Sequence, residues 1–381
     1  MFFYAPIWGS RLPDKVLCLT FDDGPDDLGV ALAGKDVHTQ SAGPQTLNLA
    51  KFLHEQGVPA TFFVLGERAK ESLDTLVALR DMGHLIGNHT DCHPNLVDAV
   101  ANGVNPVPHV LATDILIRNT LFSKAAFFSE ATFFRPPFGK WRHSGGQFSQ
   151  IADPLNKETL LSRCIGPVHW DIDSRDWACW RDGLSVESCA EQCLESIEKK
   201  GRGIILLHDS NFEEEIRSNN NTYALCRIII PELQKRGYRF VRLDAIPHVA
   251  SAALVSKRFS LKTLDGKYFV SINQHSTGCV LACVVSLSEH EEFGLVELEG
   301  EQIAIRVYNG EFLSVHGVEN GYACSFKPKI GVSESFQLIR LADNKVVFKI
   351  ADSGHFISVS PQGFDAATSI GASETFLLDI L

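Results

Sequence analysis

Short apolar runs alternate with longer amphipathic stretches from the start of the chain to about residue 248. The first run, Val16–Phe21, is almost free of polar residues, as expected for a strand buried on both faces of a parallel sheet. Similar runs predict further strands at 60–65, 84–88, 132–135, 167–172, 203–207 and 238–243. Helical spacing of apolar residues predicts helices at 46–56, 73–82, 108–121, 185–199 and 223–236. This alternation predicts parallel β/α units, in a barrel or a doubly wound sheet, and seven strands favour an incomplete barrel.

A different pattern covers about residues 255–381, where short β-type segments and frequent glycines accompany an internal repeat. The element Gly266–Ser271 recurs as Gly310–Val315 and as Gly354–Val359. A second element alternates with it, at 288–295, 333–338 and 373–378. Copies about 40 residues apart predict a closed, three-fold β architecture. We therefore expect two domains, residues 1–250 and residues 255–381.

Composition narrows the possible partners. The 381 residues carry 35 basic and 46 acidic side chains, a formal net charge of −11, so the chain lacks the basic surplus typical of nucleic-acid binding. No stretch reaches the roughly 18 apolar residues of a membrane span. The first residues lack the charged start and apolar core of a secretory signal, which favours the cytoplasm unless a signal has been removed. Ten cysteines without a framework spacing predict free, buried thiols.

Side chains of the kinds used in catalysis follow five of the predicted strands. They are Asp22 and Asp23, His89 and His93, Arg135, Asp173, and His208. In β/α barrels the C-terminal ends of the strands meet at one face, and the active site lies there. We therefore expect these residues to converge, although Asp22 and Asp23 with the following Gly-Pro could by themselves form a solvated turn.

The two histidines after the run at 84–88 suggest a metal site. His89 and His93 lie in one short turn, where both imidazoles can reach the same cation, although such a pair is often incidental. A carboxylate from another strand end would complete a site of two histidines and one carboxylate, which leaves coordination positions open for water and substrate. Cys92 lies between the histidines, and we expect it to face away from such a site.

The remaining groups suggest acid–base chemistry. Arg135 precedes two prolines, which present the backbone amide of Phe138 in a defined direction as a candidate oxyanion donor. Arg135 could also pair with Asp22 and keep that carboxylate ionised as a base, or it could be a surface arginine. His208 is a candidate general acid with Asp173 as its partner, or it belongs to a capped strand end.

Five segments together resemble the polysaccharide deacetylase (NodB-homology) family of carbohydrate esterases. In chain order they are Thr20–Asp23, His89–His93, Arg135–Gly139, Asp173–Trp177 and Ile205–Asp209. The resemblance covers about residues 14–245 and implies a distorted (β/α) barrel. It also implies a divalent metal, zinc in the first place, with cobalt, nickel or manganese as alternatives. The segments 26–44 and 140–163 are longer than their counterparts in the family, and the first could form a lid or a substrate-side loop.

The resemblance implies a role for each site residue. The metal ligands would be Asp23, His89 and His93. Asp22 would be the base and His208 the acid, tuned by Asp173, while Arg135 orients Asp22. The amide of Phe138 would meet the oxyanion, and Trp177 and Leu206 would line the pocket for the acetyl methyl group.

The implied reaction is removal of N-acetyl groups from a polysaccharide or oligosaccharide that contains N-acetylglucosamine. The same groups would also serve an O-deacetylase such as an acetylxylan esterase. A third possibility is a non-catalytic protein that binds carbohydrate or protein through its C-terminal domain. The repeats of that domain resemble a β-trefoil of the fascin-like kind, either a binding module for glycan or protein or a structural appendage.

Overall fold

The computed structural model describes residues 7–10, 12–27, 43–124, 126, 130–141, 149–273, 279–288, 290–318, 321–361 and 363–381. The chain divides into two compact units, Pro6–Ile246 and Pro247–Leu381, called here the N-terminal and the C-terminal unit. The domain ranges from the sequence place the boundary slightly later and remain a prediction. Most of the expected insertion at 26–44, and residues 142–148 of the insertion at 140–163, lie outside the described residues.

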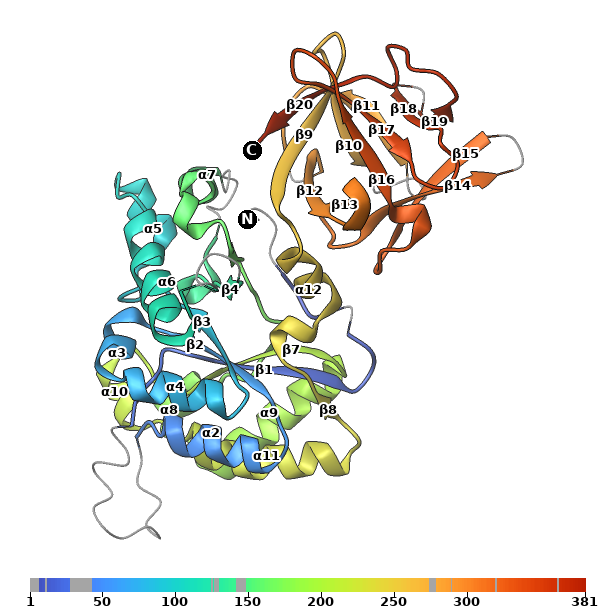
Figure 1. Ribbon diagram of the computed structural model, residues 1–381. Helices are drawn as coiled ribbons and strands as arrows, with labels where there is room; N and C mark the ends of the chain where they lie inside the picture. The colour runs from blue at the N-terminus through green and yellow to red at the C-terminus, as the bar shows by residue number, and fades with distance from the viewer. Residues whose placement is uncertain are drawn as a thin grey trace. The chain divides into compact units, whose positions relative to one another are not determined.

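Parallel strands form the centre of the N-terminal unit (Figure 1). One sheet has the order β3 (Leu85–Asn88), β2 (Ala60–Val64), β1 (Val16–Asp22), β7 (Gly203–His208) and β6 (Ile172–Asp173), and β8 (Arg239–Phe240) also pairs with β1. A second parallel pair joins β4 (Thr132–Phe133) to β5 (Cys164–Ile165). A bridge between Asn88 and Phe134 connects the two sheets. The arrangement is barrel-like, which confirms the expected α/β class.

The strand predicted at 167–172 is wrong over most of its length. Regular pairing occurs before it, in β5, and at its end, in β6. Between them only Val168 forms an isolated bridge, to Ile7. Pro167 has no backbone N–H to donate, so continuous pairing cannot run through this segment.

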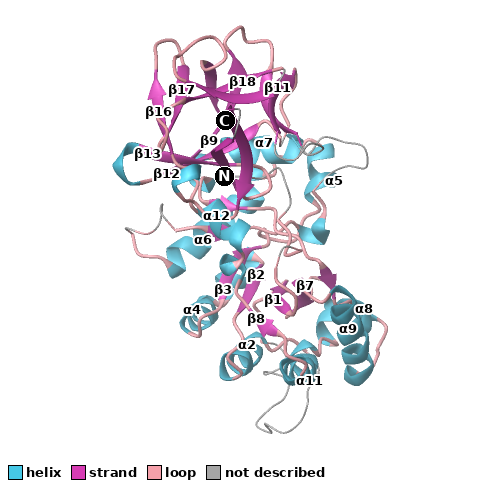
Figure 2. Ribbon diagram, turned by 90° about the vertical axis from the view of Figure 1, so that its right-hand side faces the viewer, coloured by secondary structure: helices cyan, strands magenta, loops and turns pink. Residues whose placement is uncertain are grey.

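Helices surround the parallel strands. They are α2 (Thr46–Glu55), α3 (Gly66–Glu71), α4 (Leu73–Asp81), α5 (Leu96–Ala101), α6 (Val107–Leu121), α7 (Ser149–Lys157), α8 (Asp176–Arg181), α9 (Val186–Lys200), α10 (Glu214–Ser218) and α11 (Thr222–Lys235). Figures 1 and 2 place α2, α9 and α11 along one face of the sheet. Among the described residues, no helix combines the length and apolar character that a membrane crossing requires.

Alternate side chains of β1 point to opposite faces of the sheet. Leu17, Leu19 and Phe21 pack in the main apolar core with residues of the surrounding helices. Thr20 and Asp22 alternate with them and face the interior of the barrel-like sheet, where both contact Arg135. One strand therefore anchors the core on one face and carries reactive groups on the other.

The C-terminal unit begins with α12 (Pro247–Ala253) and is otherwise antiparallel. Six strands pair in a closed ring: β9 (Lys257–Thr263), β12 (Glu292–Glu297), β13 (Gln302–Arg306), β16 (Phe336–Arg340), β17 (Lys345–Ile350) and β20 (Phe376–Ile380). Three hairpins leave this ring: β10–β11 (Phe269–Asn273, Cys279–Val284), β14–β15 (Phe312–Val318, Gly321–Lys327) and β18–β19 (Phe356–Ser360, Gly363–Ala367). The expected all-β class is confirmed.

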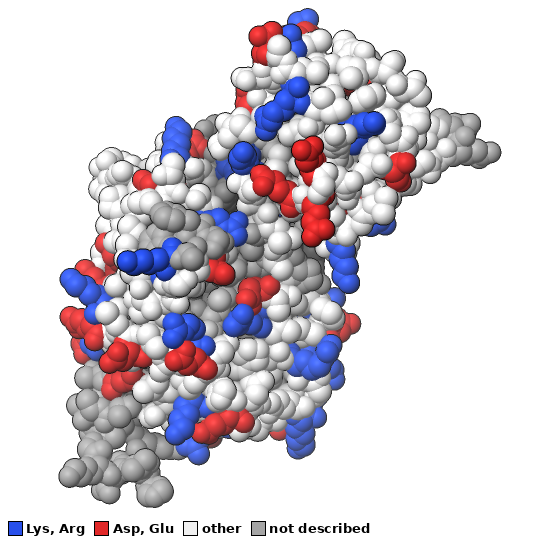
Figure 3. Space-filling view, viewed as in Figure 1, with Lys and Arg blue, Asp and Glu red and all other residues white. Residues whose placement is uncertain are grey.

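The repeated residues of this unit form its core. Phe293, Phe336 and Phe376 occupy equivalent places in the second repeated element, and each is at most 2% exposed. They belong to one apolar cluster with the aliphatic residues of the ring and hairpins. On the face drawn in Figure 3, Lys and Arg side chains are interspersed with Asp and Glu.

Candidate active site

The ends of the parallel strands meet at one cavity of about 350 Å³. Of the site residues predicted from the sequence, all except Arg135 line it: Asp22, Asp23, His89, His93, Phe138, Asp173, Trp177, Leu206 and His208. Arg135 lies fully buried behind the wall. The remaining lining residues are Gly139, Trp170, Asn211, Phe212, Glu213 and Ile216. The expected convergence of the strand ends is therefore present.

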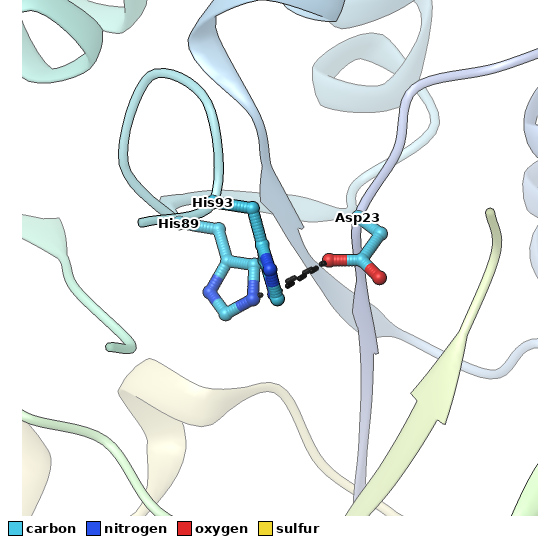
Figure 4. Close-up of side chains that lie close together, drawn as sticks. All are labelled: Asp23, His89 and His93. Atoms are coloured by element: carbon cyan, nitrogen blue, oxygen red, sulfur yellow. Dashed lines mark ion pairs between the residues drawn. The ribbon is translucent and has the colours of Figure 1, made fainter. Parts of the chain in front are cut away.

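Asp23, His89 and His93 point toward one another in this cavity (Figure 4). The Oδ1 atom of Asp23 lies 3.3 Å from Nε2 of His93 and 3.5 Å from Nε2 of His89. Nδ1 of His89 lies 2.8 Å from the carbonyl oxygen of Arg135. Because a carbonyl only accepts, this bond places the proton on Nδ1 and leaves the lone pair of Nε2 directed at Asp23.

The protonation of this trio suits a cation. Burial lowers the pKa of His89 to about 3 and that of His93 to about 2, so both rings are neutral near pH 7. Burial also raises the pKa of Asp23 to about 7. The buried Oδ1 of Asp23 has no hydrogen-bond donor among the described residues. Such a carboxylate next to two imidazole lone pairs fits a divalent cation, which would supply the missing partner.

Asp22 has a different partner. Nη1 of Arg135 donates to Oδ1 of Asp22 over 2.7 Å and to Oγ1 of Thr20 over 2.8 Å. Nε of Arg135 donates to the carbonyl of Val168, and the guanidinium lies 4.3 Å from the ring centre of Phe63. The predicted ion pair is confirmed, and Arg135 is not a surface residue. Burial outweighs the arginine charge and raises the pKa of Asp22 above its usual range, which brings the carboxylate closer to the basicity of a general base.

The prediction that Asp173 holds His208 is wrong. Oδ1 of Asp176 lies 2.8 Å from Nδ1 of His208, and Oδ2 of Asp176 accepts the backbone N–H of His208 over 2.8 Å. Asp173 accepts the backbone N–H of Arg175 instead. Arg175 has a φ of 58°, and this turn lets α8 begin with the carboxylate of Asp176 buried against β7.

Asp176 changes the protonation of His208. Burial alone would lower the pKa of His208, but the charge and hydrogen bonds of Asp176 raise it to about 10. Asp176 itself also accepts hydrogen bonds from Ser174, Thr222 and the amide of Trp177. Burial would raise the pKa of Asp176, but His208 and the amide of Trp177 lower it. The pair is therefore an imidazolium and a carboxylate near neutral pH. The segment Asp173–Trp177 contains both aspartates, and sequence reasoning selected the wrong one.

Aromatic side chains form one wall of the cavity. The ring of Phe212 stacks on His93 with centroids 4.2 Å apart, and Phe138 meets His93 edge-on at 4.5 Å. Phe138 has a φ of 59° after its two prolines, and its ring is half-exposed. Trp177 and Leu206 line the same cavity. Phe212 lies in the loop after β7 and carries no motif signal, so sequence reasoning did not include it.

Arg68 of α3 is a second contributor that the sequence did not indicate. Its guanidinium donates to the carbonyl of Asp23 over 2.7 Å and to the carbonyl of Asn211 over 2.6 Å. It also donates to the hydroxyl of Ser210. Asp23 has a φ of 75°, which is uncommon for a residue other than glycine. Arg68 therefore ties the loop after β1 to the loop after β7 and supports this backbone conformation.

Comparison with known proteins identifies the family. Residues 9–149 match the family model described as Polysaccharide deacetylase. A peptidoglycan-N-acetylglucosamine deacetylase of Bacillus cereus is 30% identical over 239 residues, which span 63% of this chain and 91% of that protein. The chain belongs to the polysaccharide deacetylase family. A chitooligosaccharide deacetylase of Sinorhizobium fredii is 29% identical over 239 residues, which span 61% of this chain and 92% of that relative.

A solved structure is also similar to this polysaccharide deacetylase. The crystal structure of the Bc1960 peptidoglycan N-acetylglucosamine deacetylase has 24% identity and a TM-score of 0.44, and the match covers 62% of this chain and 90% of that one. Family membership makes the chain a hydrolase of the carbohydrate esterase class with NodB homology, which confirms the expected enzyme class.

Proposed function

We propose that this polysaccharide deacetylase hydrolyses the N-acetyl groups of N-acetylglucosamine units in an oligosaccharide or polysaccharide, with the help of a divalent cation. The names of the two curated relatives, a peptidoglycan-N-acetylglucosamine and a chitooligosaccharide deacetylase, support this substrate class. The observation that carries the proposal is that Asp22 and His208 line one cavity together with the trio of Asp23, His89 and His93, while Asp176 holds His208 from behind by a hydrogen bond. The cavity thus joins a proton acceptor, a proton donor and a cation site.

Asp23, His89 and His93 would hold the cation, in the first place zinc, with cobalt, nickel or manganese as alternatives. When bound, such a cation polarises a carbonyl group and lowers the pKa of a water molecule to about 7. Asp22, oriented by Arg135, accepts the proton of the attacking water. The backbone N–H of Phe138 donates to the oxygen of the acetyl carbonyl as negative charge develops on it.

His208 completes the reaction in this proposal. Its imidazolium, held by Asp176, donates a proton to the amide nitrogen as the carbon–nitrogen bond breaks, so acetate and the free amine leave. Asp173 lines the cavity without a hydrogen bond to His208, and we assign it to substrate contact. Trp177 and Leu206 give an apolar surface for the acetyl methyl group.

Release of acetate from chitooligosaccharides tests this proposal. We expect release by the full chain, loss after removal of divalent metal with a chelator, and recovery with zinc or cobalt. Acetylated xylan serves as the contrast, because an O-deacetylase would use the same groups. Acetate from xylan with none from chitooligosaccharides would contradict the N-deacetylase proposal.

For the C-terminal unit we propose a β-trefoil that acts as a binding module for glycan or protein. Three features support the architecture: the closed ring of six strands, the three hairpins that leave it, and the three-fold sequence repeat. Binding of a glycan array by the full chain, with and without a soluble competitor of the catalytic cavity, tests the module. Competitor-insensitive binding is the expected result, and complete displacement would contradict it.

A further inference from the structure

A second cluster of metal-ligating side chains lies outside the catalytic cavity. It consists of Asp91, Cys92 and His109, whose carboxylate, thiol and imidazole ligand atoms all lie within 4.8 Å of one another. Asp91 and Cys92 belong to the loop between His89 and His93, and His109 belongs to the first turn of α6. None of the three lines the cavity of the active site. Cys92 thus faces away from the proposed catalytic cation, as the sequence led us to expect, and toward a different set of ligands.

Asp91 is the common hydrogen-bond partner in this cluster. Nδ1 of His109 lies 2.8 Å from Oδ1 of Asp91, and the same oxygen accepts the backbone N–H of Cys92 over 2.7 Å. The thiol of Cys92 also hydrogen-bonds to the side chain of Asp91, so the sulfur and the imidazole converge on the same carboxylate. Convergence of sulfur, nitrogen and oxygen ligands is typical of sites for zinc and similar ions.

The backbone around the cluster is held in position. The N–H of Gly66 donates to the carbonyl of Thr90, and the N–H of Glu67 donates to the carbonyl of Asp91, both over 2.9 Å. The start of α3 thus anchors the loop that carries Asp91 and Cys92, and the ligands themselves come from this loop and from α6.

We propose that Asp91, Cys92 and His109 form a second transition-metal site, for zinc or a chemically similar ion, beside the loop that carries His89 and His93. Ligand atoms on one tetrahedral zinc lie roughly 3.3 Å apart, so the Asp91–His109 contact has to open by about 0.5 Å. Binding replaces the hydrogen bonds that Asp91 makes with His109 and with the thiol of Cys92, and it releases the thiol proton. A metal here braces the loop that presents the catalytic histidines. Because Cys92 is exposed, we expect this site to fill after the buried one.

Cobalt titration of the metal-free full chain tests the proposal without reference to activity. The catalytic trio contains no sulfur, so a near-ultraviolet sulfur-to-cobalt charge-transfer band reports the second site alone. We expect about two equivalents of cobalt per chain, with the band developing during the second equivalent. Cys92→Ser removes the band and one equivalent, and His109→Ala weakens the second equivalent by about 10-fold or more. Cys283→Ser is the matched control, because Cys283 is also exposed but belongs to no such cluster among the described residues.

The two metal sites can be separated. His89→Ala removes the first equivalent and leaves the charge-transfer band in place, so a failure of the catalytic proposal does not affect this test. The second site is excluded if the wild-type chain develops no such band at any cobalt ratio. It is also excluded if Cys92→Ser retains the band or if Cys283→Ser abolishes it.

Discussion

The two units of this chain differ in the side chains that they bury together. In the N-terminal unit, charged and ionisable side chains are buried at one edge of the parallel strands, and Asp22, Asp23, His89, Arg135 and Asp176 are each at most 3% exposed. In the C-terminal unit, most buried repeated positions are aromatic or aliphatic and fill one apolar cluster, while the repeated buried glutamates, such as Glu334 and Glu374, accept hydrogen bonds from backbone amides of their own turns. Buried polar groups cost free energy unless they are paired. Their concentration at one edge therefore marks function, whereas the repeats mark packing.

Connectivity explains the contrast. Parallel strands all end at the same edge, so residues far apart in the chain meet there without disturbing the core. In the C-terminal unit, each repeat contributes strands to one ring, and similar residues return to similar places. The motifs of the N-terminal unit and the repeats of the C-terminal unit are both strong sequence patterns. Of the two, only the motifs place chemically different groups around one cavity.

The largest loss of activity should follow substitution of Asp22, the proposed general base. Asp22→Asn should lower acetate release from chitooligosaccharides by about 10³-fold, because an amide cannot accept the proton of the attacking water. Zinc content should stay at the wild-type level, since Asp22 is not among the proposed ligands. Full activity of this variant would remove Asp22 from the mechanism.

A substitution in the core of the C-terminal unit should lower stability and leave catalysis almost unchanged. Phe336→Ala should lower the free energy of unfolding by about 3–5 kcal/mol, because the side chain is fully buried in the apolar cluster. The calorimetric transition of the C-terminal unit should move to lower temperature, while kcat for a short chitooligosaccharide changes less than about twofold. A loss of kcat as large as that of Asp22→Asn would contradict the separation of roles between the units.

The His208–Asp176 pair predicts a pH effect. His208 has its pKa raised from 6.5 to about 10, so the stabilisation that its charge provides is complete below pH 6.5 and is lost as the pH rises through about 10. Asp176→Asn should remove the charge that raises this pKa. The alkaline limb of the pH–rate profile should then move to lower pH, with a loss of about 10- to 100-fold near pH 8.

Asp173→Asn is the matched control for this pair, because Asp173 lies in the same segment but makes no hydrogen bond to His208. The alkaline limb of the pH–rate profile of Asp173→Asn should lie at the same pH as that of the wild type. If Asp173→Asn moves the limb and Asp176→Asn does not, the assignment of the partner is wrong.

The smallest effect should come from the aromatic wall. Phe212→Ala should raise KM for chitooligosaccharides by about 3- to 10-fold and change kcat less, because the ring stacks on His93 and contributes apolar surface at the mouth of the cavity. Phe212→Tyr, which keeps the ring, should restore KM. An equal loss of kcat in both variants would indicate a role in positioning His93 instead.

Several features were predictable because they are local. The apolar run before Asp22 predicts β1, and the three-fold repeat predicts the antiparallel ring. The strand ends also predict the cavity, since parallel strands must end at one edge. The Asp22–Arg135 pair follows from the same reasoning and is confirmed by the structure.

Other features depend on directions that spacing does not encode. Asp173 and Asp176 lie three residues apart in one segment, and the left-handed backbone of Arg175 decides which of them reaches His208. Arg68 and Phe212 belong to no motif, and each contributes only because two loops distant in the chain lie side by side. The sulfur of Cys92 meets His109 for the same reason.

The amino-acid sequence by itself determined the alternation of strands and helices, the repeat, and the residue types that meet at the strand ends. These depend on the periodic burial of side chains and on the common direction of parallel strands. Only the tertiary structure decided which of Asp173 and Asp176 pairs with His208. A hydrogen bond forms only when donor and acceptor lie about 3 Å apart, and a single turn of the backbone moves a side chain farther than that.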